Sequence, residues 1–132
     1  QVVSIFLTQC LKQRPITLHG DGSQTRSFTY VEDVIEALIA VSELDEGLDS
    51  SKLSGASFNI GSDEEVTIRN LAELVLEVTD SSSEIVSEGN HPGDSLRRTA
   101  DVSAAESALG WNSKVNLRSG IERTWGWLQE GV

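Results

Sequence analysis

The chain has 132 residues, enough for one domain whose core needs neither disulfides nor a metal. Its 21 acidic residues outnumber its 10 basic ones, and the net charge of −11 disfavours nucleic-acid binding, which requires a basic face. No apolar stretch approaches the roughly 20 residues that span a bilayer, and the single cysteine, Cys10, excludes an internal disulfide and indicates a reducing, cytoplasmic location.

Helix, strand, strand and helix are predicted in that order over the first third of the chain. The first three elements cover residues 2–13, 16–19 and 26–31, and the last begins at Glu32 or Asp33. Pro15 ends the first helix, and a tight glycine turn at residues 20–22 joins the two strands. An acid at the start of the second helix suits the positive end of the helix dipole. This helix also carries a broad apolar stripe, formed by Val34, Ile35, Leu38, Ile39 and Val41.

Short elements continue after an acidic loop, rich in Ser and Gly, at residues 43–55. They are a strand at 57–60, a helix that Thr67 caps, a strand at 84–87, a helix that ends at Gly110, and a last helix. Residues 88–98 are predicted to be irregular. Capping-box spacing marks the starts of the last two helices, at Ser103 and Glu106 and at Ser119 and Glu122.

The alternation of helices with short strands predicts a mixed α/β fold. The strands are few and scattered, so we expect some of them to complete a sheet whose other strands lie outside the chain. The chain has no initial Met, and its first residues already have helical periodicity. We therefore expect it to be a piece of a longer protein.

Lysine is scarce in this acidic chain, which has only Lys12, Lys52 and Lys114. An acid-rich, lysine-poor surface stays soluble in high salt because counterions screen its self-repulsion. A salt-loving source and an ordinary acidic protein both fit this composition.

Residues 20–25 read GDGSQT and partly match a dinucleotide fingerprint. The third glycine is replaced by Thr25, and the motif joins two predicted strands instead of opening a helix. It therefore lacks the helix N-terminus that holds a pyrophosphate, and we interpret it as a plain turn.

Arg26 is the strongest candidate for a ligand-binding residue, because it lies in a strand-like run with Phe28 and Tyr30. A guanidinium in such a run can lie across a groove and match phosphate oxygens in two-point contact. A surface ion pair with Asp21 or Glu32 is the alternative role that composition allows.

Four blocks of sequence follow one another along nearly the whole chain. They are VVSIFLTQCLKQRPITLHGDGSQTRSFTYVEDVIEAL, SFNIGSDEEVTIRNLAELV, HPGDSLRRTADVSAAESALGW and LRSGIERTWGWL. In this order the chain resembles the C-terminal part of NAD-dependent epimerase/dehydratase proteins, in the extended short-chain dehydrogenase/reductase family. The resemblance implies that residues 1–132 are the C-terminal, substrate-binding portion of a Rossmann-like α/β fold, whose NAD-binding Rossmann domain lies outside the chain.

The resemblance also implies a set of substrate-binding residues. They are Ile16, Leu18, His19, Arg26, Asn59, His91, Asp94 and Arg97. Arg26 would grip the diphosphate of a nucleotide sugar, and the backbone around His19 would line the base pocket, where the family often has Tyr. His91 stands where the family has an arginine, which removes one permanent positive charge unless His91 is protonated or Arg97 or Arg98 reaches in.

The family uses NAD to oxidise a sugar hydroxyl before the sugar is epimerised, dehydrated or decarboxylated, and a Tyr-x-x-x-Lys pair supplies the acid and base. That pair cannot form here, because Val34 stands four residues after the only tyrosine, Tyr30. Two histidines and one cysteine are too scattered to suggest a metal site. We therefore expect this segment alone to contain no catalytic residue, to bind no NAD and to be inactive.

As part of its parent, the chain is assigned to a UDP-sugar 4-epimerase, with a UDP-glucuronate decarboxylase or a dTDP-sugar 4,6-dehydratase as alternatives. Its expected partners are a UDP- or dTDP-linked sugar, its own N-terminal Rossmann half and a second copy in a homodimer, with no nucleic acid and no membrane. A non-catalytic acidic module that binds a partner through its tryptophan-bearing end is the alternative from another class.

The three tryptophans are expected to differ in their surroundings. Trp111 should pack against the last helix, as the family's LGW anchor does, and Trp125 should be buried one turn from Ile121. Trp127 falls on another face of the last helix and should be exposed unless an interface covers it.

Overall fold

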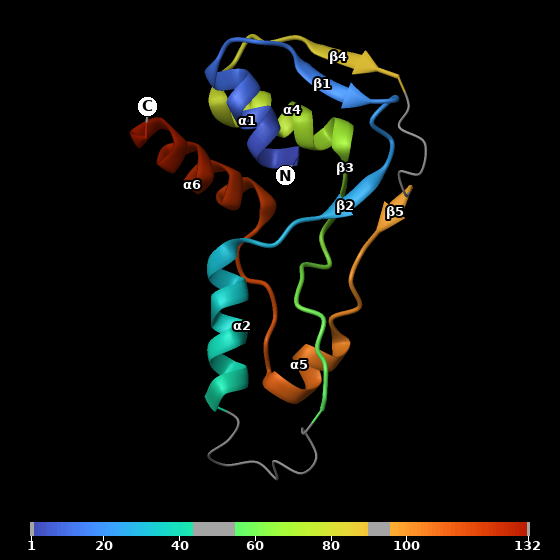
Figure 1. Cartoon of the computed structure of the whole chain (residues 1–132), viewed down its shortest axis with the longest axis vertical. Helices are drawn as coiled ribbons and strands as arrows, with labels where there is room; N and C mark the ends of the chain where they lie inside the picture. Colours follow the sequence, from blue (N-terminus) through green and yellow to red (C-terminus); the bar gives the residue numbers. More distant parts are fainter. Residues whose placement is uncertain (1, 44–54, 90–95, 132) are drawn as a thin grey trace.

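A computed structural model describes residues 2–43, 55–89 and 96–131. The first five elements are α1 (Val2–Leu11), β1 (Ile16–His19), β2 (Thr25–Ser27), α2 (Val31–Glu43) and β3 (Glu65–Thr67). The remaining five are α4 (Ile68–Thr79), β4 (Ile85–Glu88), β5 (Arg97–Arg98), α5 (Ser103–Leu109) and α6 (Leu117–Glu130). Helices and short strands alternate along an elongated molecule, and the predicted mixed α/β class is confirmed (Figure 1).

The strands form two small sheets. β1 and β4 pair in parallel, with Ile16 opposite Ile85 and His19 opposite Glu88. In the second sheet, β2 lies between antiparallel β3 and parallel β5. The second sheet lies between the end of the molecule that holds β1 and β4 and the end that holds α2 and α5 (Figure 1).

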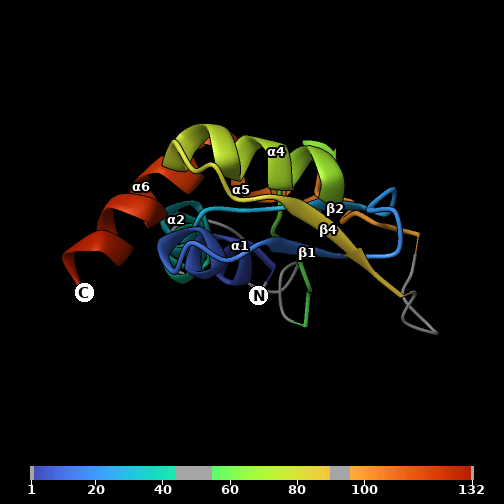
Figure 2. The same ribbon diagram turned by 90° about the horizontal axis from the view of Figure 1, so that it is seen from above.

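The main core lies where α1 and α4 run side by side next to the β1–β4 pair (Figure 2). Apolar residues at helical spacing supply its buried side chains from both helices, and alternate residues of β1 supply the rest. Its buried members are Phe6, Leu7, Cys10, Ile16, Leu18, Ile68, Leu71, Ala72, Val75 and Ile121. Cys10 is 5% exposed and is therefore a core residue.

A second, smaller cluster joins α2 to α5 and consists of Ala37, Ala105 and Trp111. Trp111 is 5% exposed, but it packs against α2, so the prediction that it packs against the last helix is wrong. The interaction that decides its position is a hydrogen bond from the indole Nε1 to the backbone oxygen of Asp33, at 2.9 Å. Trp127 is 72% exposed as predicted, and Trp125 is only half-buried.

Helix starts were predicted with mixed success. Thr67 caps α4 as expected, because its hydroxyl accepts a hydrogen bond from the Asn70 N–H at 3.1 Å. Neither predicted capping box forms. The Asp101 carboxylate instead accepts from the Ser103 N–H, at 3.0 Å. The cap of α6 is Asn116, three residues before Ser119, and its side chain accepts from the Ser119 N–H at 2.9 Å.

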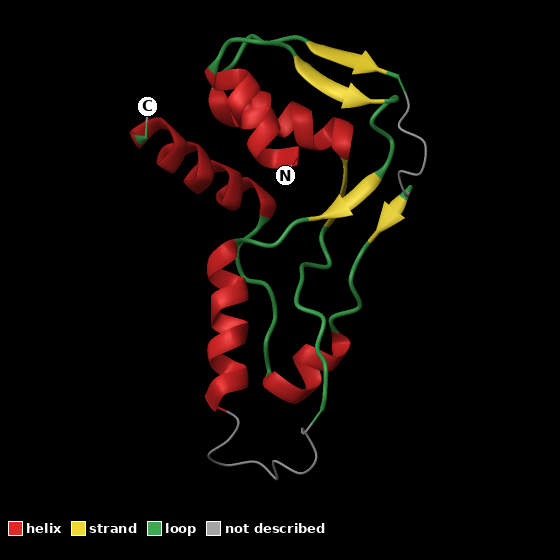
Figure 3. Ribbon diagram, in the orientation of Figure 1, coloured by secondary structure: helices red, strands yellow, loops and turns green. Residues whose placement is uncertain are grey.

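The predicted strand at residues 57–60 is wrong, and the segment that leads to β3 is drawn as loop in Figure 3. A strand needs a neighbouring backbone to hydrogen-bond with, and none of the described strands pairs with these residues. The strand predicted at 26–31 is also shorter, since β2 ends at Ser27 and α2 begins at Val31.

The apolar stripe of α2 does not face the core. The buried residues of α2 are Asp33 and Ala37, whereas Ile35, Leu38 and Ile39 are 49%, 64% and 50% exposed. This outer face of α2 is therefore defined by apolar side chains that no other described element covers. None of the described helices is both long and apolar enough to cross a membrane.

Candidate functional site

Arg26 and Arg98 lie next to each other on one face of the second sheet. Arg26 occupies the middle of β2, and the parallel register of β2 with β5 places Arg98 directly opposite it. Residues in register on neighbouring strands project from the same face of a sheet. The Arg26 side chain is half-buried, with Nη1 donating to the Thr25 carbonyl at 2.7 Å, whereas Arg98 is exposed.

On the opposite face of this sheet, the side chains of Thr25, Glu65 and Arg97 are hydrogen-bonded to one another. Arg97 binds Glu65 through two nitrogens, with Nε 3.0 Å from Oε1 and Nη2 3.0 Å from Oε2. The Thr25 hydroxyl donates to the same carboxylate. These bonds hold the pKa of Glu65 below its usual range and raise that of Arg97, first through the hydrogen bonds and then through the ion pair.

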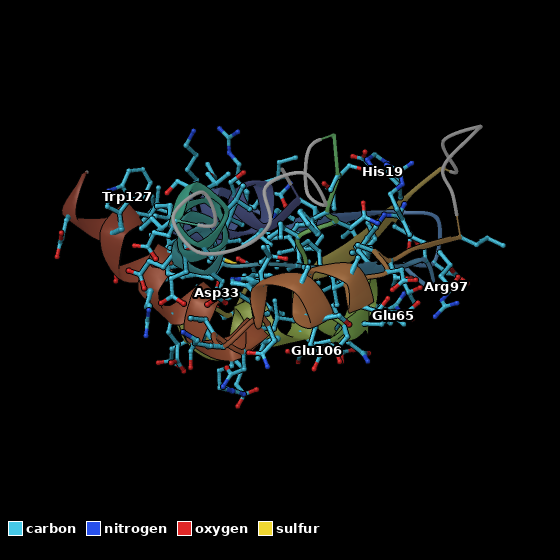
Figure 4. The ribbon with its side chains drawn as sticks, turned by 90° about the horizontal axis from the view of Figure 1, so that it is seen from below. His19, Asp33, Glu65, Arg97, Glu106 and Trp127 are labelled. Carbon is cyan, nitrogen blue, oxygen red and sulfur yellow. The ribbon has the colours of Figure 1, made fainter. Side chains whose placement is uncertain are left out.

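Arg97 is therefore not on the face that Arg26 occupies. Successive residues of a strand project to opposite faces, so Arg97 and Arg98 diverge. Figure 4 shows Arg97 beside Glu65, on the side of the ribbon away from His19. The structure thus brings together Arg26 and Arg98 and does not bring together Arg26 and Arg97.

The residues predicted to line a base pocket occupy β1. Ile16 and Leu18 are both 0% exposed, so their side chains belong to the core and only their backbones can contact a ligand. His19 ends β1 and is exposed. Beyond it, a shallow hollow of about 540 Å³ lies at the carboxyl ends of β1 and β4, the edge at which α/β sheets bind ligands.

The other predicted site residues are placed differently. The Asn59 amide donates to the backbone oxygen of Asp101 at 3.1 Å, so this side chain fastens the segment that precedes α5. His91 and Asp94 lie outside the described residues.

Two guanidinium groups in register on neighbouring strands can contact the same anion. This face of the sheet is therefore a candidate site for an anionic group. Paired guanidinium groups bind and orient phosphate or carboxylate oxygens, and they supply no general base at neutral pH.

The chemistry of hydride transfer has no counterpart among these residues. The Tyr30 ring lies under the Arg123 guanidinium, with 5.3 Å from Cζ to the ring centroid, and is not paired with a lysine. The glycine turn joins β1 to β2 and opens no helix, so this turn offers no helix N-terminus to the pyrophosphate of NAD. Among the described residues, no group of three or more His, Cys, Asp or Glu side chains could hold a metal ion.

Arg98 is the residue that sequence reasoning did not select. The sequence left Arg97 and Arg98 as alternatives, and only the register of β5 with β2 decides which of them shares a face with Arg26. A two-residue strand after an irregular stretch gives no sequence signal for that register.

Comparison with known proteins places the chain in a known family. The sequence profile of the GDP-mannose 4,6 dehydratase family matches residues 1–124. The chain belongs to this family of NAD-dependent epimerases and dehydratases.

Individual relatives share most of the chain. UDP-glucuronic acid decarboxylase 1 of Arabidopsis thaliana is 41% identical over 123 residues, which are 93% of this chain and 26% of that protein. UDP-glucuronic acid decarboxylase 3 of the same plant is 41% identical over 121 residues, which are 92% of this chain and 33% of that protein. The chain thus spans about a quarter to a third of the length of these curated relatives.

Solved structures share its fold over nearly the whole chain. UDP-glucose 4-epimerase of Thermotoga maritima, with UDP-glucose, superposes with a TM-score of 0.87 at 29% identity, covering 99% of this chain and 40% of that one. UDP-glucuronic acid 4-epimerase of Bacillus cereus, in complex with UDP-glucuronic acid and NAD, gives a TM-score of 0.87 at 26% identity. The match covers 100% of this chain and 40% of that one.

Proposed function

We propose that this chain is the substrate-binding portion of an NAD-dependent enzyme that acts on UDP-glucuronic acid, with decarboxylation as the leading reaction. The observation that carries the proposal is the pairing of Arg26 with Arg98 on one sheet face. Support for the substrate comes from relatives of both reaction types, since plant decarboxylases and the Bacillus cereus 4-epimerase are named for UDP-glucuronic acid.

The choice of reaction differs from the sequence-based assignment, which favoured a UDP-sugar 4-epimerase. The decarboxylases reach 41% identity, against 29% and 26% for the epimerase structures. Decarboxylation of a uronic acid is therefore the better-supported reaction, and 4-epimerisation is the second candidate.

UDP-glucuronic acid carries a diphosphate and a carboxylate, and the two arginines can meet both. Arg26 is half-buried and held by the Thr25 carbonyl, so it is the more fixed of the two and suits the diphosphate. Arg98 is exposed at the edge of the sheet, so its side chain can change conformation to contact the carboxylate. In this arrangement the chain positions the sugar and contributes no acid, base or hydride.

We infer that NAD and the catalytic residues belong to a Rossmann half encoded elsewhere in a longer protein, and that this half covers the outer face of α2. The exposed Ile35, Leu38 and Ile39 give that face its apolar character. The unpaired segment at 57–60 would then complete a sheet of the same half.

Calorimetric titration with UDP-glucuronic acid tests the proposal. Arg26→Ala and Arg98→Ala should each weaken binding by roughly tenfold or more, because each removes a charge-assisted contact. Arg118→Ala is the matched control, since Arg118 pairs with Glu77 on α4, away from the second sheet. Binding that is insensitive to both site variants would refute the arginine pair, and no binding by a folded sample would favour a non-catalytic interaction module.

UDP-glucose separates the roles of the two arginines, because it has the diphosphate without the carboxylate. Arg26→Ala should weaken binding of both sugars, whereas Arg98→Ala should affect UDP-glucuronic acid more strongly. If Arg98→Ala weakened binding of UDP-glucose and UDP-glucuronic acid equally, Arg98 would be assigned to the diphosphate instead.

A further inference from the structure

A second hollow, of about 520 Å³, lies at the amino ends of β1 and β4, because Pro15 and Glu84, which precede the two strands, line it. The ends of α1 and α4, the turn that leads into β4, and Trp125 of α6 complete its wall. Figure 1 shows the loops that lead into β1 and β4 at the ends of these strands away from β2 and β5. None of the described residues that line this hollow belongs to the sheet that carries Arg26 and Arg98.

Two carboxylates in this hollow have no counter-charge. Asp80 and Glu84 are both exposed, and within the described part of the chain neither side chain forms an ion pair or a hydrogen bond. Lys12 and Arg14 lie between α1 and β1, and neither of them lines the hollow. The charged side chains of the wall are therefore all negative.

The helix ends add to this negative potential. Both α1 and α4 end at the hollow, and the carbonyl end of a helix carries about half a negative charge. Neither helix has a basic residue in its last turn to offset that charge. The hollow is therefore unsuited to a phosphate or a carboxylate and suited to a cation.

The turn that carries the two carboxylates is held by its own hydrogen bonds. The Ser81 N–H donates to the Leu76 carbonyl at 3.1 Å, and the Ser81 hydroxyl bonds to that of Ser83 at 2.9 Å. The Glu84 carbonyl accepts from the Ile16 N–H at 2.8 Å, which fixes the end of the turn against β1. A ligand therefore meets a turn that is already formed.

Size and lining determine the class of cation. Among the residues that the structure describes, no group of three or more His, Cys, Asp or Glu side chains could hold a metal ion. A hollow of about 520 Å³ instead has the volume of a small-molecule site. Trp125 is half-buried and gives the wall an indole, which attracts ammonium groups and covers alkyl chains.

From these observations we propose that the hollow is a second binding site, which takes a small alkylammonium or polyamine cation. The ammonium groups pair with Asp80 and Glu84, and the alkyl chain packs on the Trp125 indole. Both carboxylates are exposed, so the affinity is modest, with a Kd on the order of a millimolar. The site shares no residue with the arginine pair and does not depend on the proposed function.

An NMR titration of the isotope-labelled full chain with putrescine tests the site, and butanediol is the neutral molecule of matching length. Putrescine should shift the amide signals of residues 79–84 and the indole signal of Trp125, and butanediol should not. Asp80→Asn and Glu84→Gln should each raise the Kd for putrescine about threefold. Glu73→Gln is the matched control, because it removes the same charge from an exposed position of α4 outside the hollow.

Three results would overturn the proposal. If butanediol shifted the same signals as strongly, the hollow would be a site for neutral polyols. If Glu73→Gln weakened binding as much as the two site variants, putrescine would be responding only to the net charge of −11. If a folded chain showed no shift at residues 79–84, the hollow would bind no such cation.

Discussion

The Trp111 indole donates to the backbone carbonyl of Asp33, at 2.9 Å, and the Asp33 side chain binds the residues that follow Trp111. Its Oδ2 accepts from the Ser113 hydroxyl and from the backbone N–H groups of Lys114 and Val115, at 3.2, 3.1 and 3.0 Å. Asp33 is 2% exposed. One residue at the start of α2 therefore holds the connection between α5 and α6 through both its main chain and its side chain.

Replacing Asp33 with Ala should lower the free energy of unfolding by about 2–4 kcal/mol, because two backbone N–H groups lose their acceptor inside the protein. Urea denaturation followed by tryptophan fluorescence measures the loss. Glu36→Gln is the control, since Glu36 forms an exposed ion pair with Lys114 and should change stability by less than about 1 kcal/mol. Equal effects of the two substitutions would contradict the structural role of Asp33.

The helix caps give a second prediction. Thr67→Ala and Asn116→Ala should each destabilise the chain by about 1 kcal/mol, because each removes the acceptor of a first-turn N–H. Ser103→Ala should have a much smaller effect, since the Ser103 hydroxyl donates to Asp101 and does not cap α5. Chemical denaturation of the three variants checks this order. If Ser103→Ala lost as much stability as Thr67→Ala, the result would support the capping box predicted from the sequence.

Gly22 joins β1 to β2 in a conformation that other residues resist. Its φ is +74°, and a Cβ would lie 2.9 Å from Leu18 Cδ1 and 3.1 Å from the Arg69 backbone nitrogen. Gly22→Ala should therefore cost more than the roughly 1–2 kcal/mol of left-handed strain alone. Gly110→Ala isolates that strain, because Gly110 has φ +61° and open space around it. Denaturation midpoints that coincide for the two variants would show that the turn can relax.

The Glu65–Arg97 pair predicts a response to acid. The Arg97 and Thr25 hydrogen bonds lower the pKa of Glu65, so the stabilisation is complete above the ordinary glutamate value of 4.5 and is lost as the pH falls through the lowered value. The pairing of β5 should loosen in that acidic window. Side-chain carboxyl chemical shifts in an NMR titration should place the pKa of Glu65 below the ordinary glutamate value of 4.5. Glu65→Gln should remove the acid transition, and an unshifted Glu65 would count against the pair.

The net charge of −11 predicts a dependence on salt. Raising KCl from about 0.05 to about 1 M should raise the thermal midpoint, because screening weakens repulsion among the acids more than it weakens the few exposed ion pairs. Differential scanning fluorimetry measures the shift. A midpoint that falls with salt would show that pairs such as Arg123–Glu32 outweigh the repulsion.

Local patterns predicted the parts of this fold that local chemistry determines. Helical periodicity predicted a helix where α1 lies, and Thr67 marked the start of α4. Two predictions failed for different reasons. The indole of Trp111 bonds to a residue 78 positions earlier, which local spacing does not reveal. The capping-box spacing at Ser103 was overridden by a neighbouring side chain, because Asp101 accepts the Ser103 N–H.

The candidate site shows the same division. Strand alternation predicts that Arg97 and Arg98 point to opposite faces, but only their pairing with β2 tells which of them joins Arg26.

Both parallel pairings, β1 with β4 and β2 with β5, connect segments roughly 70 residues apart along the chain. Neither pair can assemble during synthesis until the late segment has left the ribosome. The ligand-facing surface should thus be the last part of this domain to mature, and interruption of translation before Arg98 should yield helices without a substrate-binding face.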